Sequence, residues 1–167
     1  MRIGYTMARE RGALDPLLAD LANRAGAAGL RLAGVVQRNP QAEGAARCDM
    51  EAVILPDGPA VPISQSLGRH ARGCRLDEAG LAAAVAAARM RLEAGCDLLL
   101  VNKFGKAEAL GRGFRDLIAE AVARGVPVLV GVGPANLDAL QDFAGGAAEA
   151  VEPDALLDWC RGAVPAD

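Results

Sequence analysis

The chain has 167 residues, 52% of them hydrophobic, and a net charge of −3 at pH 7. That length suits a single domain over residues 1–167 with one buried core, and the weakly acidic balance excludes a general binder of nucleic acid or anionic membranes, since both need a dominant basic surface. No apolar run approaches the roughly 20 residues needed for membrane insertion, and residues 1–6 lack the charged-then-apolar plan of a signal peptide, so the expected localisation is cytoplasmic.

Short apolar segments alternate along the chain with segments of helical periodicity. Strands are predicted at residues 2–5, 30–36, 51–55, 61–63, 96–101 and 126–132. Helices are predicted at residues 15–29, 77–95, 113–125, 134–143 and from 153 onward, with Asp15 and Asp77 as N-caps and a glycine at the end of each of the first three. Residues 38–49 and 105–111 are predicted to be loops.

This alternation predicts βαβ units, and therefore an α/β fold of three layers with a mostly parallel sheet and helices on both faces. The unbroken apolar run at residues 96–101 is typical of a central strand that is buried on both faces. In such sheets ligands bind beyond the carboxyl ends of the strands. The loops that follow the strands are therefore the places to look for a site.

Rare polar residues gather in the loop after this central strand. The chain has two lysines, and both, Lys103 and Lys106, fall within four residues. Glycines there let backbone N–H groups approach a ligand, and the helix expected near Gly113 offers unpaired N–H groups. We predict an oxyanion or phosphate site in this loop, and the competing interpretation is a solvated loop whose lysines only aid solubility. The candidate ligand-binding residues are Asn102, Lys103, Gly105, Lys106, Glu108 and Arg112.

A second polar segment, residues 64–75, holds both serines and the single histidine of the chain. Its candidate ligand-binding residues are Ser64, Gln65, Gly68 and Arg75. His70 is a candidate proton carrier, because imidazole titrates near neutral pH. If the first loop binds an oxyanion, this segment is the expected lid or second wall. The alternative is an exposed basic loop in an arginine-rich protein.

Metal binding and disulfide bonds are not expected. Cys48, His70 and Cys74 could converge as metal ligands, but their spacing matches no compact zinc pattern. None of the four cysteines lies in a Cys-x-x-Cys pair, and a cytoplasmic chain would keep them reduced. A serine nucleophile is poorly supported too, because Gly-x-Ser-x-Gly is absent.

A phosphate-binding P-loop is missing from the sequence. That motif needs Gly-Lys followed by Ser or Thr, because the lysine contacts the β- and γ-phosphates and the hydroxyl holds Mg²⁺. Neither lysine here is followed by a hydroxyl residue, and residues 6–12 (TMARERG), which follow the first strand, contain no lysine. Ordinary Mg²⁺-dependent ATP hydrolysis is therefore disfavoured, and no Mg²⁺ site is recognised.

The sequence around the lysines resembles a small bacterial family of uncharacterised domains that is commonly encoded near molybdate transport genes. The specific string is VNKFGKAE at residues 101–108, continued by GRGFR at residues 111–115. Supporting matches are Gln37, Cys48-Asp49, Gln65-x-Leu67-Gly68 and the CRLD string at residues 74–77. The resemblance extends over nearly the whole chain.

The same region is more distantly similar to small P-loop nucleoside-triphosphatases and to the molybdopterin-guanine-dinucleotide accessory GTPases. In those relatives the corresponding strand ends in an acidic pair, whereas this chain has Asn102-Lys103 there and keeps Gly105 and Glu108. The resemblance implies a P-loop-NTPase-like fold without a Gly-Lys-Ser/Thr loop, in which hydrolysis is in doubt and anion binding is retained. The ligand it implies is a nucleotide or a smaller oxyanion such as molybdate.

Three functions follow from these patterns. The preferred one is a cytoplasmic binding protein for a small anion, an oxyanion or a nucleotide, that serves molybdenum handling. The second is a divergent nucleotide hydrolase or transferase, in which Glu108 orients water and His70 or Lys103 stabilises charge. The third is a regulatory module whose alanine-rich helices pair with a transporter subunit or with a second copy of the chain.

Overall fold

The computed structural model describes residues 1–40, 50–65 and 75–166, and its centre is a seven-stranded sheet. The strand order is β4-β3-β2-β7-β8-β1-β9. The strands are β1 (Ile3–Thr6), β2 (Leu32–Arg38), β3 (Glu51–Ile54), β4 (Ala60–Pro62), β7 (Leu98–Phe104), β8 (Val128–Val132) and β9 (Glu149–Ala150). A separate antiparallel pair is formed by β5 (Ser64–Gln65) and β6 (Arg75–Leu76).

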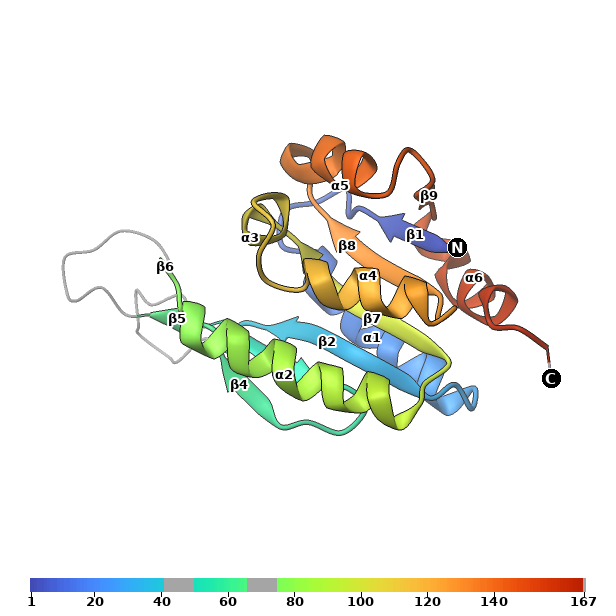
Figure 1. The fold of residues 1–167 in the computed structure, drawn as a ribbon, viewed down its shortest axis with the longest axis horizontal. Helices are drawn as coiled ribbons and strands as arrows, with labels where there is room; N and C mark the ends of the chain where they lie inside the picture. The colour runs from blue at the N-terminus through green and yellow to red at the C-terminus, as the bar shows by residue number, and fades with distance from the viewer. Residues whose placement is uncertain (41–49, 66–74, 167) are drawn as a thin grey trace.

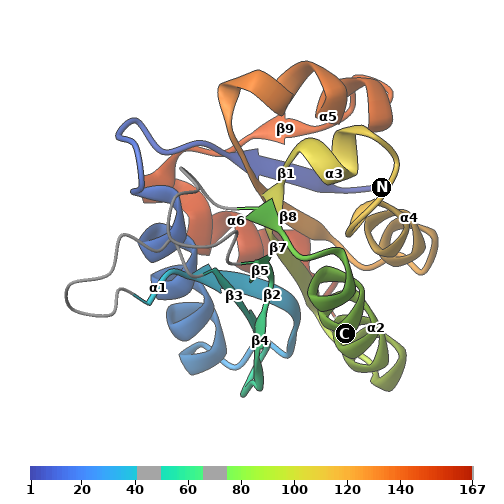
Figure 2. The same cartoon turned by 90° about the vertical axis from the view of Figure 1, so that its left-hand side faces the viewer.

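Helices cover both faces of this sheet, so the three layers expected from the sequence are confirmed. The helices are α1 (Leu14–Ala27), α2 (Glu78–Ala94), α3 (Lys106–Ala109), α4 (Arg115–Ala123), α5 (Leu137–Phe143) and α6 (Leu156–Ala163), with 3₁₀ turns η1 (Pro134–Asn136) and η2 (Pro153–Ala155). Figures 1 and 2 show α2 and α4 on one face and α1 and α6 on the other. Each pair covers its own hydrophobic cluster of buried side chains.

The central position of β7 is also confirmed. β2, β7, β8 and β1 run parallel, with β7 in the fourth of the seven places. Residues 98–102 of β7 are buried, because both faces of the strand are covered by helices. Since parallel strands end at the same edge, the segments after β1, β2, β7 and β8 meet at one side of the molecule (Figure 1).

The edge strand on the β4 side of the sheet contains a proline. Pro62 lies in β4, which pairs with β3 alone, and proline is tolerated there because an edge strand can do without one of its N–H groups. At the opposite edge, the two-residue strand β9 was not predicted, because two residues carry no usable periodicity.

Two local predictions were wrong. Asp15 does not cap α1, which begins one residue earlier; its carboxylate contacts side chains of neighbouring segments instead. The loop expected at residues 105–111 contains the short helix α3, which Glu108 stabilises by accepting a hydrogen bond from Gly105 N at 2.9 Å. Asp77 is the N-cap of α2 as predicted, and its side chain accepts from Ala79 N at 3.1 Å.

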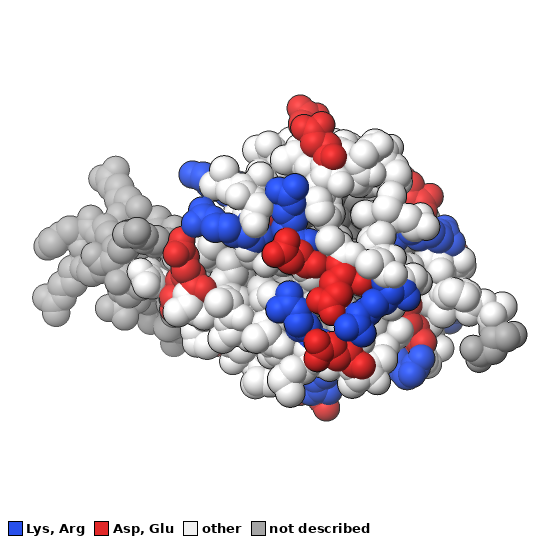
Figure 3. Space-filling model, viewed as in Figure 1, with Lys and Arg blue, Asp and Glu red and all other residues white. Residues whose placement is uncertain are grey.

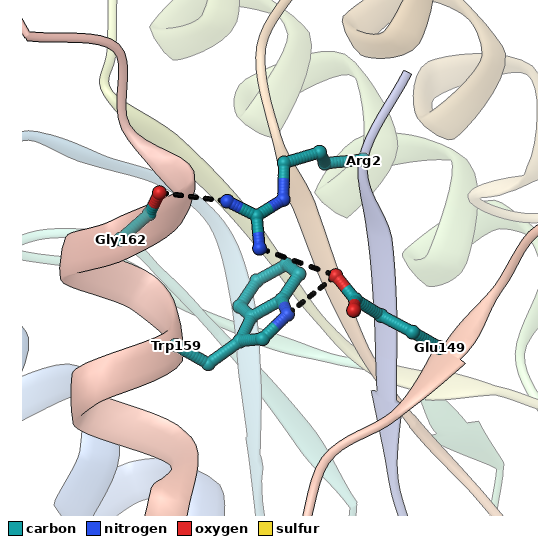
Figure 4. A network of polar contacts seen from close by, with 4 residues as sticks. All are labelled: Arg2, Glu149, Trp159 and Gly162. Carbon is teal, nitrogen blue, oxygen red and sulfur yellow. Dashed lines mark hydrogen bonds and ion pairs between the residues drawn. The ribbon is translucent and has the colours of Figure 1, made fainter.

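A network of polar contacts joins Arg2, which precedes the first strand, to β9 and to the last helix (Figure 4). Arg2 donates to Gly162 O at 2.7 Å and lies over the ring of Trp159, 5.3 Å from its centroid. The Trp159 indole donates to Glu149 Oε1 at 2.7 Å. A Cβ on Gly4 would lie 2.7 Å from the Trp159 ring, so a glycine is required for this close packing.

Candidate functional site

A cavity of about 170 Å³ opens at the carboxyl end of β7, where the sequence placed its first candidate site. Its walls come from the ends of β2 and β7, from the β3–β4 hairpin and its flanking residues, from β6, from the first turns of α2 and α3, and from the residue that precedes α4. The polar lining residues are Gln37, Asn102, Lys103, Lys106 and Glu108, and the apolar ones include Met50, Ala52, Ile63, Leu76, Leu81 and Phe114.

Both lysines line this cavity, and both are exposed to solvent. Lys103 is the one exposed residue within the otherwise buried β7, and Lys106 begins α3. No ion pair joins either ammonium group to a carboxylate among the described residues. Two exposed positive charges that line one cavity, and that have no ion-pair partner among the described residues, can attract an anion.

Asp15 accepts hydrogen bonds from two amide side chains, one of which belongs to a residue that lines the cavity. Its Oδ1 accepts from Asn102 Nδ2 at 3.0 Å, and its Oδ2 accepts from Asn39 Nδ2 at 2.8 Å. Asn39 Oδ1 in turn accepts from Gln37 Nε2 at 3.0 Å. A carboxylate only accepts hydrogen bonds, so it fixes which end of each amide faces it.

This chain of contacts leaves one buried amide oxygen without a partner. Asn102 is 4% exposed, and its Oδ1 has no hydrogen-bond partner among the described residues. Gln37, which also lines the cavity, donates its Nε2 to Asn39. Of the polar lining residues, Asn102 and Glu108 are buried, and both lysines are exposed.

Glu108 holds the loop that carries the lysines. It is 4% exposed, and its two oxygens accept from Gly105 N at 2.9 Å and from Phe114 N at 3.1 Å. Gly113 has φ +62° and sits against this carboxylate, so a Cβ there would run into Glu108 Oε1. One of the N–H groups that the sequence offered to a ligand near Gly113, that of Phe114, is thus already bound by Glu108.

Arg112, the remaining charged candidate of this loop, lies elsewhere. Its guanidinium pairs with Glu78 at 3.0 Å and lines a different groove of about 410 Å³ between α2 and α4. Figure 3 shows basic and acidic side chains alternating over this face, consistent with its ion pairs, such as Arg89 with Glu120 at 3.0 Å. The structure therefore brings Lys103 and Lys106 together and leaves Arg112 apart from them.

The second polar segment lies partly within the described residues. Ser64 Oγ accepts from Met50 N at 2.8 Å, so this hydroxyl ties β5 to the start of β3. Gln65 is exposed and pairs through the backbone with Arg75 in the β5–β6 ribbon. Ile63 and Leu76, which flank the segment, line the lysine cavity. The candidates Gly68 and His70 lie outside the described residues.

The candidate metal ligands Cys48, His70 and Cys74 also lie outside the described residues. Within residues 1–40, 50–65 and 75–166, no group of three or more His, Cys, Asp or Glu side chains is placed to hold a metal ion. Of the other cysteines, Cys160 is buried, and burial raises the pKa of its thiol to about 11. Over the same ranges, no helix is long and apolar enough to cross a membrane.

A comparison with protein-family models identifies the family of the chain. One model, described as "Protein of unknown function (DUF2478)", matches residues 3–159. The chain belongs to this DUF2478 family. The match includes the lysine loop and all seven strands of the sheet, so the cavity is part of the family domain.

A much longer curated protein is similar to this chain over one part of its length. It is "Molybdenum import ATP-binding protein ModC 2" of Bradyrhizobium diazoefficiens, 41% identical over 145 residues, which are 87% of this chain. The match spans 16% of the length of that protein. A DUF2478 domain thus has a close relative within a protein named for molybdenum import.

Among solved structures, the "Solution Structure of a Human Cancer-Related Nucleoside Triphosphatase" is similar in fold. Its TM-score is 0.66 at 15% identity, covering 97% of this chain and 95% of that one. The expected likeness to a nucleoside-triphosphatase fold is therefore confirmed. The connection between β1 and α1, where a P-loop lies in such folds, holds MARERGA at residues 7–13 here.

The sequence analysis did not predict three residues as members of this hydrogen-bonded site. Asp15 was interpreted as a helix cap, Asn39 was placed in a loop without a function, and Gln37 was noted for its resemblance alone. The only available signal was their position after predicted strands, or at the start of the predicted first helix. Their mutual contacts depend on how the strands are ordered.

Proposed function

We propose that this DUF2478 chain is a cytoplasmic binding protein for a small anion, either a nucleotide or an oxyanion, and that it serves molybdenum handling. One observation carries the proposal: Lys103 and Lys106 line one cavity and have no ion-pair partner in the described part of the chain. The place also agrees with the rule that ligands bind beyond the carboxyl ends of parallel strands.

Hydrolysis of a nucleoside triphosphate is not part of the proposal. The start of α1, where a P-loop protein holds phosphate, has no lysine and carries the carboxylate of Asp15 in its first turn. A carboxylate there repels a phosphate and already uses the nearby amides of Asn39 and Asn102. Glu108, the candidate for orienting water, has both oxygens bound to backbone amides.

The link to molybdenum rests on the relative named for molybdenum import. In cells that contain the chain, we expect removal of both lysine charges to lower molybdenum content at limiting molybdate, measured by elemental mass spectrometry. Unchanged molybdenum content in those cells, and in cells without the chain, argues against this part of the proposal alone.

Anion binding is tested by titration calorimetry of the purified chain with molybdate, tungstate, sulfate, ATP and GTP, each with and without Mg²⁺. We expect at least one anion to bind, and the Lys103→Gln/Lys106→Gln variant to weaken that binding tenfold or more. Arg24→Gln is the matched control, because it removes one positive charge from an exposed pair with Asp20 on α1. If every anion fails to bind below millimolar concentration, the proposal is wrong.

A further inference from the structure

Lys103 lies where the regular alternation of β7 ends. Earlier in the strand, successive side chains enter different hydrophobic clusters, as expected of a strand covered on both faces. Leu98 and Leu100 belong to the cluster beneath α1 and α6, whereas Leu99 and Val101 belong to the one beneath α2 and α4. If this alternation continued unchanged, residue 103 would enter the second cluster, where an unpaired ammonium group would be costly to bury.

The register with β8 shows one extra residue at this place. Asn102 lies opposite Gly131 and Phe104 lies opposite Val132, so two steps along β7 match one step along β8. Such a β-bulge changes the direction of the side chains that follow it. Phe104 accordingly enters the cluster beneath α2 and α4, where it is 1% exposed. Lys103 is the exposed residue between two buried neighbours, and it lines the cavity.

Both neighbours of Lys103 are anchored, one on each face of the sheet. On the α1 side, Asn102 donates its Nδ2 to Asp15 Oδ1 at 3.0 Å, and among the described residues its Oδ1 has no partner. On the other side, the ring of Phe104 packs near that of Phe143, with 6.0 Å between the ring centroids. The side chain of Asn102 is therefore held by Asp15, one residue before the bulge.

From the bulge and its anchor we infer that Asp15 is a positioning residue for the anion site. By holding Asn102, it fixes the bulge that presents Lys103 to the cavity. Asp15 does not line the cavity, and its two carboxylate oxygens accept from Asn102 and Asn39, so it acts through Lys103 and not by touching the anion. The inference rests on the proposed anion site and adds the residue that orients it.

The sign of one substitution separates positioning from charge. A carboxylate near an anion site repels the anion, so by charge alone Asp15→Ala would tighten binding. If Asp15 acts through Lys103, the same substitution weakens binding, and we expect a loss of tenfold or more. Asp15→Asn removes the charge but keeps an oxygen that can accept from Asn102, so it should retain most of the affinity that Asp15→Ala loses.

The test measures binding of molybdate, tungstate, sulfate, ATP and GTP to the full chain by calorimetry. Asp15→Ala should weaken binding in the native and Lys106→Gln backgrounds and add no further loss in Lys103→Gln, because two residues that act through one contact are not additive. Asp20→Ala is the matched control, since it removes the same charge from α1 at an exposed pair with Arg24. Tighter or unchanged binding in Asp15→Ala, or an equal loss in the Lys103→Gln background, overturns the inference.

The lysines also give a readout that needs no anion. Reductive ¹³C-methylation labels Lys103, Lys106 and the Met1 amine, and NMR can follow each label. We expect Asp15→Ala to shift the Lys103 signal and to leave that of Lys106 in place. An unmoved Lys103 signal in a chain that circular dichroism shows to be folded overturns the inference. Asn102→Leu, which breaks the same hydrogen bond from the other side, serves if Asp15→Ala unfolds.

The two readouts keep this inference distinct from the proposed function. If the Lys103 signal moves but none of the five anions binds the native chain, Asp15 still positions the lysine and the anion site is wrong. If an anion binds through the two lysines but Asp15→Ala leaves its affinity unchanged, the anion site stands and the positioning role is wrong.

Discussion

Removal of the Glu108 side chain should be among the most destabilising changes in this loop. Its carboxylate satisfies two backbone N–H groups, of Gly105 and Phe114, and Glu108 itself is 4% exposed. In Glu108→Ala both amides lose their partner. Each buried donor left unpaired costs about 1–3 kcal/mol, so the free energy of unfolding should fall by about 2–6 kcal/mol. For a chain of this size, that corresponds to a fall in Tm of roughly 4–24 °C.

Glu108→Gln separates hydrogen bonding from size. Its amide oxygen can still accept from one of the two N–H groups, but its NH₂ group then faces the other, so about half of the loss is expected. Both variants are measured by urea unfolding, followed by circular dichroism and extrapolated linearly to water. Glu93→Ala is the matched control, because Glu93 is exposed on α2, and an exposed substitution changes stability within about 0.5 kcal/mol.

The reasoning fails if Glu108→Ala is as stable as Glu93→Ala, because the two amides would then be satisfied without the carboxylate. It also fails if Glu108→Gln is as destabilised as Glu108→Ala, since one of the two hydrogen bonds should survive. A loss in both variants, larger in alanine, supports the view that Glu108 builds the loop that carries Lys103 and Lys106.

Three further predictions concern other parts of the fold. Trp159→Ala should lower the unfolding free energy by about 2–4 kcal/mol, because the ring packs on Gly4, whereas Trp159→Phe should lose only about 1 kcal/mol with the indole hydrogen bond; equal losses in urea titrations would contradict this account. Hydrogen bonds from Arg31 hold the pKa of Asp97 below its usual range. The stability lost in Asp97→Asn should therefore be largest near neutral pH and should disappear as the pH falls below about 4. Urea titrations at several pH values can check this. The Cys160 thiol is fully buried with a pKa raised to about 11, so peptide mapping should find it unmodified by a thiol reagent at pH 8 in the native chain and modified in urea; modification at equal rates in both would refute the burial.

Local patterns were enough to predict the architecture. The run at residues 96–101 is apolar without alternation, which indicates a strand covered on both faces, and β7 is the middle strand of the sheet. The clustering of Lys103 and Lys106 after that strand pointed to the edge where the cavity lies. Both inferences depend only on periodicity and on the rule that parallel strands end at a common edge.

The chemistry inside the cavity could not be predicted in the same way. Asp15 and Asn102 are 87 residues apart, and nothing local to either says that they share a hydrogen bond. Asp15 satisfied the sequence rule for a helix cap, and Glu108 was predicted to bind a ligand or to orient water. In the folded chain Asp15 accepts from amides that other strands bring close, whereas Glu108 accepts from two backbone N–H groups of its own loop.

The sequence by itself thus determined the layers, the central strand and the place of the lysines, because the alternation of apolar residues and the positions of glycine and proline act over a few neighbours. The tertiary structure alone decided which polar atoms are satisfied and which, like the buried Asn102 Oδ1, have no hydrogen-bond partner among the described residues. The reason is that hydrogen-bond partners are set by the order of strands across the sheet, and that order places side by side residues that the chain holds far apart.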